Sequence, residues 1–395
     1  SFGSTRKLNL SADKDPQVKA LLDAETEYVC IVGKSSKLHI NKAIQATIDQ
    51  AIEMAVDTIN FLVQNKKKVF FDAEHFFDGY KEDSTTSLKI LDAVISTKVE
   101  KFVFCDTNGG TLPSEVYEII SDITLKYPKE KFGVHFQNDN GCAVANSMVA
   151  VDLGVSHVQG TINGYGERTG NADLCTLIPN LTLKKGYETI PEQSLGQLTQ
   201  TANHIAELVN VAIDSRHPYV GSSAFTHKAG LHASGMAKDS SLYEHIDSAA
   251  VGNFTRTTVS ELAGRASVLT KAEEFGLKFD NDDAKKLIEE VQNLEHLGYQ
   301  FEAADGSLFI LMNKLKNIEP NFFKFESFRV FSERRNSENV VSEAVCKIIV
   351  DENRYVKTGE GVGPVDALSK ALKSALENDY PKVNEIKLID YKVRI

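Results

Sequence analysis

Polar side chains gather in this sequence wherever a run of apolar, strand-forming residues ends. Residues 132–137 predict one such strand, and because side chains two apart on a strand share a face, His135 and Gln137 point the same way. The other strand ends carry Asp72, Glu74 and His75; Asp106, Thr107 and Asn108; Asn138 and Asp139; Asn163 and Asn171. Together these carboxylates, imidazoles and amides favour metal-assisted chemistry on a small carboxylated molecule.

Taken singly, each of these residues also has a plain structural interpretation. His135 is either a hydrogen-bonded histidine or a metal ligand. Glu74 is either a solvated loop carboxylate or an acid–base group, and Asp106 could simply cap the loop before Pro113. The functional interpretation rests on their convergence at one edge of a sheet.

A glycine-rich loop follows the strand predicted at 155–161. Gly164, Gly166 and Gly170 lie within seven residues and permit either a tight turn or a close approach of the backbone to a ligand. The polar strand ends just upstream favour the ligand-binding interpretation.

The elements that position these groups alternate along the first part of the chain. Strands and helices alternate up to about residue 180, which predicts parallel βα units in an α/β protein. One long helix is predicted over residues 40–63. Six strands are visible, a number that fits either a doubly wound sheet or an incomplete barrel.

The second half of the chain has a different pattern. Helices are predicted over residues 195–211 and through most of 258–300, and a small α/β module begins near Phe325. We predict its order as strand, strand, helix (364–376), strand.

Composition excludes several classes of function. The chain of 395 residues has 44 basic and 55 acidic residues and a net charge of −11, which argues against nucleic acid and anionic membranes as partners. No apolar run is long enough to span a membrane. The five cysteines form no C-x-x-C pair and are typical of buried thiols in a reducing compartment, so we expect a cytoplasmic protein.

Long motifs carry a resemblance to a known family. They are the segments 70–79 (FFDAEHFFDG), 105–112 (CDTNGGTL), 159–168 (QGTINGYGER), 225–232 (FTHKAGLH) and 243–247 (YEHID). The chain resembles the isopropylmalate synthase-like acyltransferases, and within them the citramalate synthase branch.

The resemblance implies a fold and a domain plan. The expected fold is a TIM-type (β/α)8 barrel that lacks its first two strands, followed by a helical linker and part of a regulatory α/β module. The expected ranges are 1–190 for the barrel, 191–320 for the linker and 321–395 for the regulatory, dimerisation-type module. Ser1 is not an initiator methionine and the alternating pattern at 386–395 stops without a turn, so we expect the chain to be cut at both ends. Because the first two strands are missing, we expect it to be inactive by itself.

The resemblance also implies chemistry and partners. Such enzymes use a divalent metal ion, here Mg²⁺, Mn²⁺ or Zn²⁺, and condense acetyl-CoA with a 2-keto acid, here pyruvate, in branched-chain amino-acid biosynthesis. A homodimer is expected. The residues carried over by position are Glu74, His232 and Tyr243 for catalysis, Thr107, Gly164 and Gly166 for substrate binding, and His135, Gln137 and Asn171 for the metal.

Two departures from the family pattern keep alternatives open: the missing first two strands, which would line part of the keto-acid pocket, and the metal motif. The family's metal motif is His-x-His, whereas this chain has His135-Phe136-Gln137, and a glutamine oxygen is a poorer ligand for Zn²⁺ than imidazole. The rival functions are an isopropylmalate-type synthase that takes a bulkier keto acid and a non-catalytic relative kept for binding or assembly.

Overall fold

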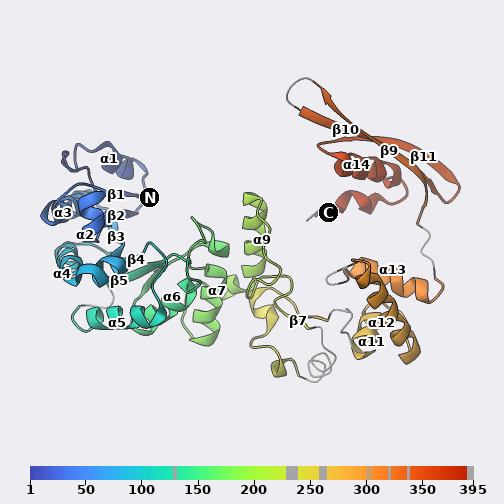
Figure 1. Cartoon of the computed structure of the whole chain (residues 1–395), viewed down its shortest axis with the longest axis horizontal. Coiled ribbons are helices and arrows are strands. Elements are labelled where there is room, and N and C mark those ends of the chain that lie inside the picture. Colours follow the sequence, from blue (N-terminus) through green and yellow to red (C-terminus); the bar gives the residue numbers. More distant parts are fainter. Residues whose placement is uncertain are drawn as a thin grey trace. The chain divides into compact units, whose positions relative to one another are not determined.

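The computed structural model describes residues 1–127, 131–227, 239–257, 265–299, 301, 304–318, 322–335 and 339–388 (Figure 1). The chain divides into two compact units. Unit 1 comprises Ser1–Thr226 and Ser240–Arg256, and unit 2 comprises His227–Asp239 and Thr257–Ile395. Among the described residues, no helix combines the length and apolar character needed to cross a membrane.

Unit 1 is built on a six-stranded parallel sheet. Its strands are β1 (Phe2–Ser4), β2 (Tyr28–Lys34), β3 (Lys68–Glu74), β4 (Lys101–Asp106), β5 (Phe132–Phe136) and β6 (His157–Gln159). They pair in the order β1-β2-β3-β4-β5-β6, so each strand lies beside its neighbour in sequence. A doubly wound sheet would reverse its order at a switch point, and the unbroken order is that of a barrel. The α/β, barrel-type prediction is therefore confirmed.

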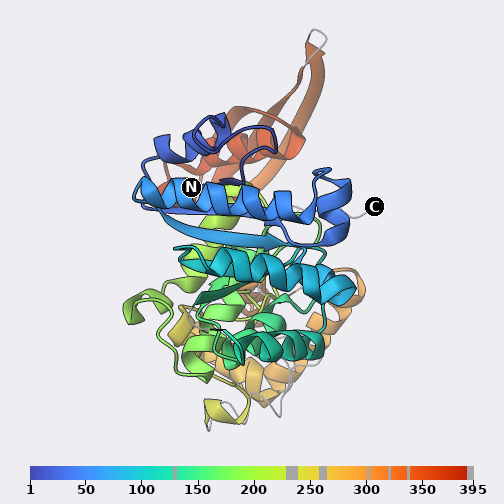
Figure 2. The ribbon, with the colours of Figure 1, turned by 90° about the vertical axis from the view of Figure 1, so that its left-hand side faces the viewer.

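Helices connect and cover these strands. They are α1 (Pro16–Asp23), α2 (Lys37–Lys42), α3 (Ile48–Gln64), α4 (Phe76–Ile95), α5 (Pro113–Thr124) and α6 (Ala143–Asp152). Figure 2 shows α3 and α4 running side by side. The single helix predicted over 40–63 was wrong, because Thr47 and Gln50 form a capping box that starts a new helix inside the apolar pattern.

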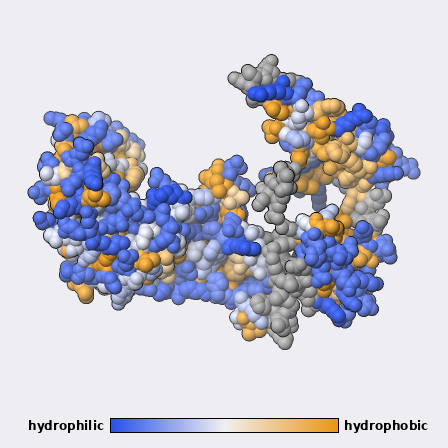
Figure 3. Space-filling model, in the orientation of Figure 1, coloured by the Kyte–Doolittle hydropathy of each residue, from blue (hydrophilic) through white to orange (hydrophobic). Residues whose placement is uncertain are grey.

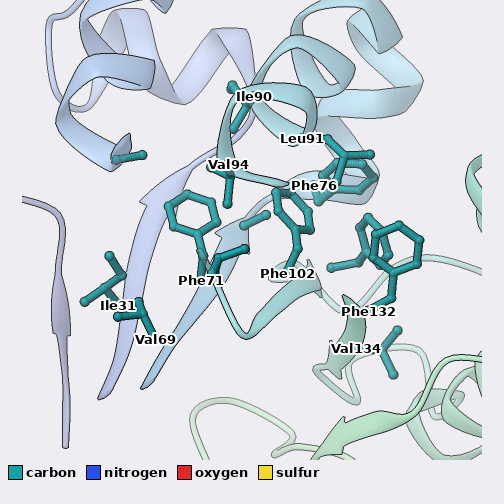
Figure 4. Packing of buried hydrophobic residues seen from close by; sticks show 14 of the residues in the cluster. Ile31, Val69, Phe71, Phe76, Ile90, Leu91, Val94, Phe102, Phe132 and Val134 are labelled. Atoms are coloured by element: carbon teal, nitrogen blue, oxygen red, sulfur yellow. The ribbon is translucent and has the colours of Figure 1, made fainter. Parts of the chain in front are cut away.

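Alternate residues of the strands face opposite sides of the sheet. The side covered by helices, here called the helix face, is apolar: Phe71, Phe102 and Phe132 are fully buried. Figure 4 shows these rings beside Ile90, Leu91 and Val94 of α4. The opposite side, here called the inner face, carries Cys30, Asp72, Glu74, His135 and Gln159.

A contact across the inner face shows that the sheet curves. Gln159 Nε2 on β6 donates to Asp72 Oδ1 on β3 at 2.9 Å, although β4 and β5 lie between these strands in the sheet. Neighbouring strands are about 4.8 Å apart, so three steps across a flat sheet would separate β3 and β6 by ~14 Å. The inner face is therefore concave, as closure toward a barrel requires.

The rest of unit 1 packs beside the last strands. It contains α7 (Leu174–Pro179), a π-turn (Asn180–Lys184), α8 (Glu192–Leu195), α9 (Leu198–Val209) and two short 3-10 turns (Ser240–Leu242 and Ser248–Val251). Leu198, Ala202, Tyr219, Phe225 and Val251 belong to a separate apolar cluster. The short strands β7 (Thr226–His227) and β8 (Arg256–Thr257) pair where the chain passes between the units.

Unit 2 has a helical part and a small sheet. The helices are α11 (Arg265–Glu274), α12 (Asn281–His296) and α13 (Asp305–Leu315), and Leu287, Val291 and Met312 are buried among them. Strands β9 (Lys324–Arg335), β10 (Asn339–Val350) and β11 (Asn353–Gly361) form an antiparallel sheet covered by α14 (Pro364–Leu376). A 3-10 turn follows (Pro381–Glu385).

The module that ends the chain differs from its predicted order. Three strands precede the helix, where the sequence predicted two, because the turn at residues 351–352 joins β10 and β11 into a hairpin. The helix at 364–376 was predicted correctly. The strand predicted over 386–395 lies largely outside the described residues.

Candidate active site

Glu74 ends β3 on the inner face and is paired with a lysine. Lys34, which ends the neighbouring strand β2, forms an ion pair with the Glu74 carboxylate, and the two side chains are only 24% and 23% exposed. Ser35 fixes the backbone of Glu74, since its N–H and its hydroxyl both donate to the Glu74 carbonyl oxygen at 3.0 and 2.7 Å. Glu74 is thus held on the inner face and is not a freely solvated loop carboxylate.

Thr107 follows β4 and is tied to the end of β3. Its Oγ1 accepts a hydrogen bond of 2.8 Å from the backbone N–H of His75. His75 has a positive φ of 60°, a conformation that costs a non-glycine residue free energy and often occurs at functional sites. The His75 ring stacks on His39 with a centroid distance of 3.6 Å, and burial, together with His75, lowers the pKa of His39.

Asp106, one residue before Thr107, has a structural role. Its carboxylate accepts from the backbone N–H of Thr111 at 3.1 Å and from the Thr111 hydroxyl at 2.8 Å. It therefore shapes the loop before Pro113, as the structural interpretation of the sequence proposed.

An arginine joins three strand-end loops. Arg168 donates to both carboxylate oxygens of Asp139 at 2.7 and 2.9 Å, and its Nη2 donates to the carbonyl oxygen of Thr107 at 2.8 Å. The arginine holds the pKa of Asp139 below its usual value, while Asp139 raises the pKa of Arg168. Asn138, the neighbour of Asp139, supports the start of α6, because the N–H of Ala143 donates to Asn138 Oδ1 at 3.2 Å.

Two amide oxygens at this edge of the sheet are buried without a partner. The segment that contains Asn171 runs beside the end of β5, where Gln137 and Asn171 form an isolated bridge. Asn171 Nδ2 donates to Tyr165 O at 2.9 Å. Among the described residues, neither Gln137 Oε1 nor Asn171 Oδ1 accepts a hydrogen bond. A buried acceptor without a partner costs ~1–3 kcal/mol, a cost that a bound ion or water at these two oxygens would offset.

The glycines of the loop make room for Asn171. A Cβ on Gly166 would lie 2.1 Å from Asn171 Nδ2, and one on Gly170 would lie 1.9 Å from the carbonyl oxygen of Gly164. Gly164 itself has a φ of 66° and accepts the N–H of Asn171 at 3.0 Å. The tight-turn interpretation is confirmed, and the turn brings Asn171 beside Gln137. The ligand-binding interpretation stays a prediction.

His135 is linked to a buried carboxylate through one amide. Its Nδ1 lies 2.8 Å from Gln159 Oε1, and Gln159 Nε2 donates to Asp72 Oδ1 at 2.9 Å. Burial is the main influence on Asp72 and raises the pKa of its carboxyl group. Burial and the nearby Asp72 likewise raise the pKa of the Cys30 thiol on β2. Gln159 is a site residue that the sequence reasoning missed.

The donors at this edge fit a hard divalent ion. Among the described residues, no group of three or more His, Cys, Asp and Glu side chains is arranged to hold a metal. One imidazole, His135, and two unpaired amide oxygens, Gln137 Oε1 and Asn171 Oδ1, nevertheless gather where β5 ends. Oxygen-rich sets suit Mg²⁺ and Mn²⁺ better than Zn²⁺.

Of the other two predicted catalytic residues, only Tyr243 lies among the described residues. Tyr243 follows the turn Ser240–Leu242 and is 44% exposed. The ring of His245, two residues further on, packs against Tyr219 and Phe225. The prediction for His232 falls outside the described residues.

Three known family models match successive parts of the chain. Residues 6–205 match the HMGL-like family, residues 219–298 match the homocitrate synthase post-HMGL domain-like family, and residues 302–395 match the LeuA allosteric (dimerisation) domain. The chain therefore belongs to the HMGL-like family, in the subset whose barrel is followed by a post-HMGL region and a LeuA-type domain.

Within this family, the chain can be compared with individual enzymes by sequence identity. The chain is 44% identical over 398 residues to an (R)-citramalate synthase of Aquifex aeolicus and 42% identical over 398 residues to one of Geobacter sulfurreducens; both alignments cover 100% of this chain and 75% of the relative. It is 30% identical over 363 residues to a probable 2-isopropylmalate synthase of Archaeoglobus fulgidus, covering 90% of this chain and 70% of that protein.

Proposed function

We propose that this protein condenses acetyl-CoA with pyruvate and releases citramalate and CoA. The observation that carries the proposal is the similarity over the entire chain: identity is 44% to an (R)-citramalate synthase, against 30% to a probable 2-isopropylmalate synthase. The strand-end network supplies groups suited to this reaction.

Glu74 is proposed as the base. A carboxylate on the inner face can take a proton from the methyl group of acetyl-CoA, and the enolate carbon then forms a bond to the keto carbon of pyruvate. Water cleaves the thioester of the product, which releases CoA. Lys34 holds Glu74 on the inner face, so the base is positioned before the substrate arrives.

Thr107 is proposed to bind the carboxylate of the keto acid. Its Oγ1 accepts from His75 N, which leaves its own hydroxyl hydrogen to donate to an anion. Arg168 and His75 fix Thr107 from two sides. Gly164 and Gly166 are proposed to line the same substrate, and Tyr243 and His232 to assist with acetyl-CoA.

His135, Gln137 and Asn171 are the proposed ligands of a divalent metal ion, on which members of this family generally depend. When bound, the ion would polarise the keto group of pyruvate. Its proposed place beside β5 is supported by the two unpaired amide oxygens.

The substrate is tested by CoA release. The full-length protein is given acetyl-CoA with pyruvate, with 2-ketoisovalerate or with neither, and free thiol is measured. We expect the highest kcat/KM with pyruvate. A higher value with 2-ketoisovalerate would make the protein an isopropylmalate-type synthase. No release with either, together with no binding of Mn²⁺ or Mg²⁺ by calorimetry, would indicate a non-catalytic relative.

A homodimer is proposed on the basis of unit 2. Its match to the LeuA dimerisation domain is supported by β9, where Phe325, Phe328 and Phe331 are 46–61% exposed on an edge strand. Figure 3 shows hydrophobic side chains on the surface of this unit. Light scattering should give twice the mass of the chain, and a monomer at micromolar concentration would contradict the proposal.

A further inference from the structure

Three polar side chains from three strands form one chain of contacts across the inner face. Asp72 on β3 accepts from Gln159 Nε2 on β6, and Gln159 Oε1 lies 2.8 Å from His135 Nδ1 on β5. We propose that Gln159, oriented by Asp72, is a positioning residue: it fixes neutral His135 in the tautomer protonated on Nδ1 and thereby leaves Nε2 unprotonated for a metal ion. The proposal deepens the proposed function, on whose metal site it rests.

Asp72 determines which way the Gln159 amide points. The NH₂ group of Gln159 points to Asp72, since Nε2 donates to Asp72 Oδ1 at 2.9 Å, and an ionised carboxylate, which only accepts hydrogen bonds, keeps it there. The reverse orientation would bring the amide oxygen against the carboxylate. Asp72 is only 6% exposed, and water has little access to replace the amide. The oxygen of the amide is therefore left to face His135.

The orientation of the amide in turn determines the tautomer of His135. A neutral imidazole has one N–H, and a ring nitrogen 2.8 Å from a carbonyl oxygen forms a hydrogen bond only if it carries that hydrogen. Among the described residues, this is the only hydrogen bond of the His135 ring. Nε2 therefore keeps its lone pair, which is the form of the ring that binds a metal.

The position of Gln159 argues against a purely structural role. It is the register partner of His135 in the sheet, so the two side chains stand next to each other on the inner face. Barrel interiors are filled mainly by branched apolar side chains, and burying a polar chain here gives up that packing. Within the chain of contacts, His135 lies two residues before Gln137 on the same side of the strand, and Gln137 and Asn171 carry the unpaired oxygens.

The first experiment measures the tautomer of His135 in the metal-free protein. Magic-angle-spinning ¹⁵N NMR of full-length, histidine-labelled protein, at a pH where the ring is neutral, distinguishes the two tautomers; the His135 signal is the one missing from His135→Ala. We expect an Nδ1–H tautomer in the wild type. We expect Gln159→Leu and Asp72→Asn to convert it partly or wholly to Nε2–H, and Glu118→Gln, an exposed carboxylate on α5, to leave it unchanged.

Metal affinity gives the second readout. Calorimetry with Mn²⁺ should show ~10–100-fold weaker binding for Gln159→Leu than for the wild type. An Nε2–H tautomer in the wild type, or an unchanged tautomer in both Gln159→Leu and Asp72→Asn, would overturn the inference. Failure of the wild type to bind Mn²⁺ would instead count against the proposed metal site, while the tautomer measurement would still decide the role of Gln159. Circular dichroism identifies a variant that does not fold, in which case the other variant decides.

Discussion

The two faces of the parallel sheet in unit 1 are built from the same strands but from different chemistry. On β3, Phe71 and Ala73 point to the helix face and are fully buried, whereas Asp72 and Glu74 point to the inner face and are paired with Gln159 and Lys34. On β5, Phe136 packs on the helix face beside the inner-face residue His135.

This alternation separates stability from function within a single strand. The helix face consists of apolar side chains that together exclude water. The inner face also carries polar groups, of which Asp72, Glu74 and His135 each have a specific partner. A shift of one residue in strand register would exchange the two sets. The apolar helix face therefore also determines where the proposed catalytic groups lie, and substitutions on the two faces should have separable effects.

The largest separable effect is expected at Glu74. Glu74→Gln should lower kcat by ~10²–10⁴-fold, because a positioned acid–base group is lost, and should leave the thermal transition nearly unchanged. CoA release and thermal melting followed by circular dichroism measure the two quantities. Glu118→Gln, an exposed carboxylate on α5, serves as the control and should change neither. Wild-type turnover in Glu74→Gln would remove Glu74 from the mechanism.

On the helix face, a substitution is expected to lower stability and to leave substrate binding unchanged. Phe102 is fully buried and its ring contacts Phe71, Phe76 and Phe104 at centroid distances of 5.2–5.7 Å. Phe102→Ala should lower the free energy of unfolding of unit 1 by ~3–5 kcal/mol, through lost burial and the cavity left behind. Phe102→Leu should cost less, and protein that remains folded should keep its KM for pyruvate. An altered KM in folded protein would show that the two faces are coupled.

The sequence predicted the sheet well because its signals are local. Each strand of unit 1 is a short apolar run that ends in a polar cluster, and that pattern alone located Glu74, Thr107 and His135 at strand ends. The prediction from sequence failed where a helix-start signal lies inside a longer apolar periodicity. The capping box of Thr47 and Gln50 interrupts a continuous apolar periodicity, and only the cap hydrogen bonds reveal the break between α2 and α3.

The sequence did not predict which side chains would contact each other across the sheet. Gln159 and Asp72 are 87 residues apart, and they meet only because the sheet curves. Lys34 was missed for a similar reason, although its even spacing from Cys30 puts it on the inner face. A polar residue at an inner position of an otherwise apolar strand is the signal that would have indicated both residues. The roles of the predicted site residues remain predictions.

A smaller effect, on the choice of metal ion, is expected at the proposed metal site on the inner face. Gln137→His should tighten Zn²⁺ binding by about tenfold, ~1.4 kcal/mol, relative to Mn²⁺, because imidazole is a softer donor than an amide oxygen. Calorimetry of both proteins with both ions measures the preference. The apolar helix face is unaffected, so the melting temperature of the metal-free protein should stay the same. Unchanged affinity for both ions would mean that residue 137 does not contact the metal.

The smallest effect is expected at the start of α3, in the helical layer. Thr47 Oγ1 accepts from Gln50 N at 3.2 Å, and Gln50 Oε1 accepts from Thr47 N at 2.9 Å, so the side chains of both residues satisfy free N–H groups at the helix start. Thr47→Ala removes one of these bonds and should lower the free energy of unfolding by ~0.5–2 kcal/mol, whereas Thr47→Ser keeps the hydroxyl and should lose much less. Neither change should alter kcat or metal affinity, because α3 supports the helix face and not the groups on the inner face.

Denaturation and CoA release, measured on the same preparations, test this prediction for Thr47→Ala and Thr47→Ser. A loss of turnover in folded Thr47→Ala would mean that the helical layer transmits small shifts through the sheet to Glu74, and the separation of the two faces would fail.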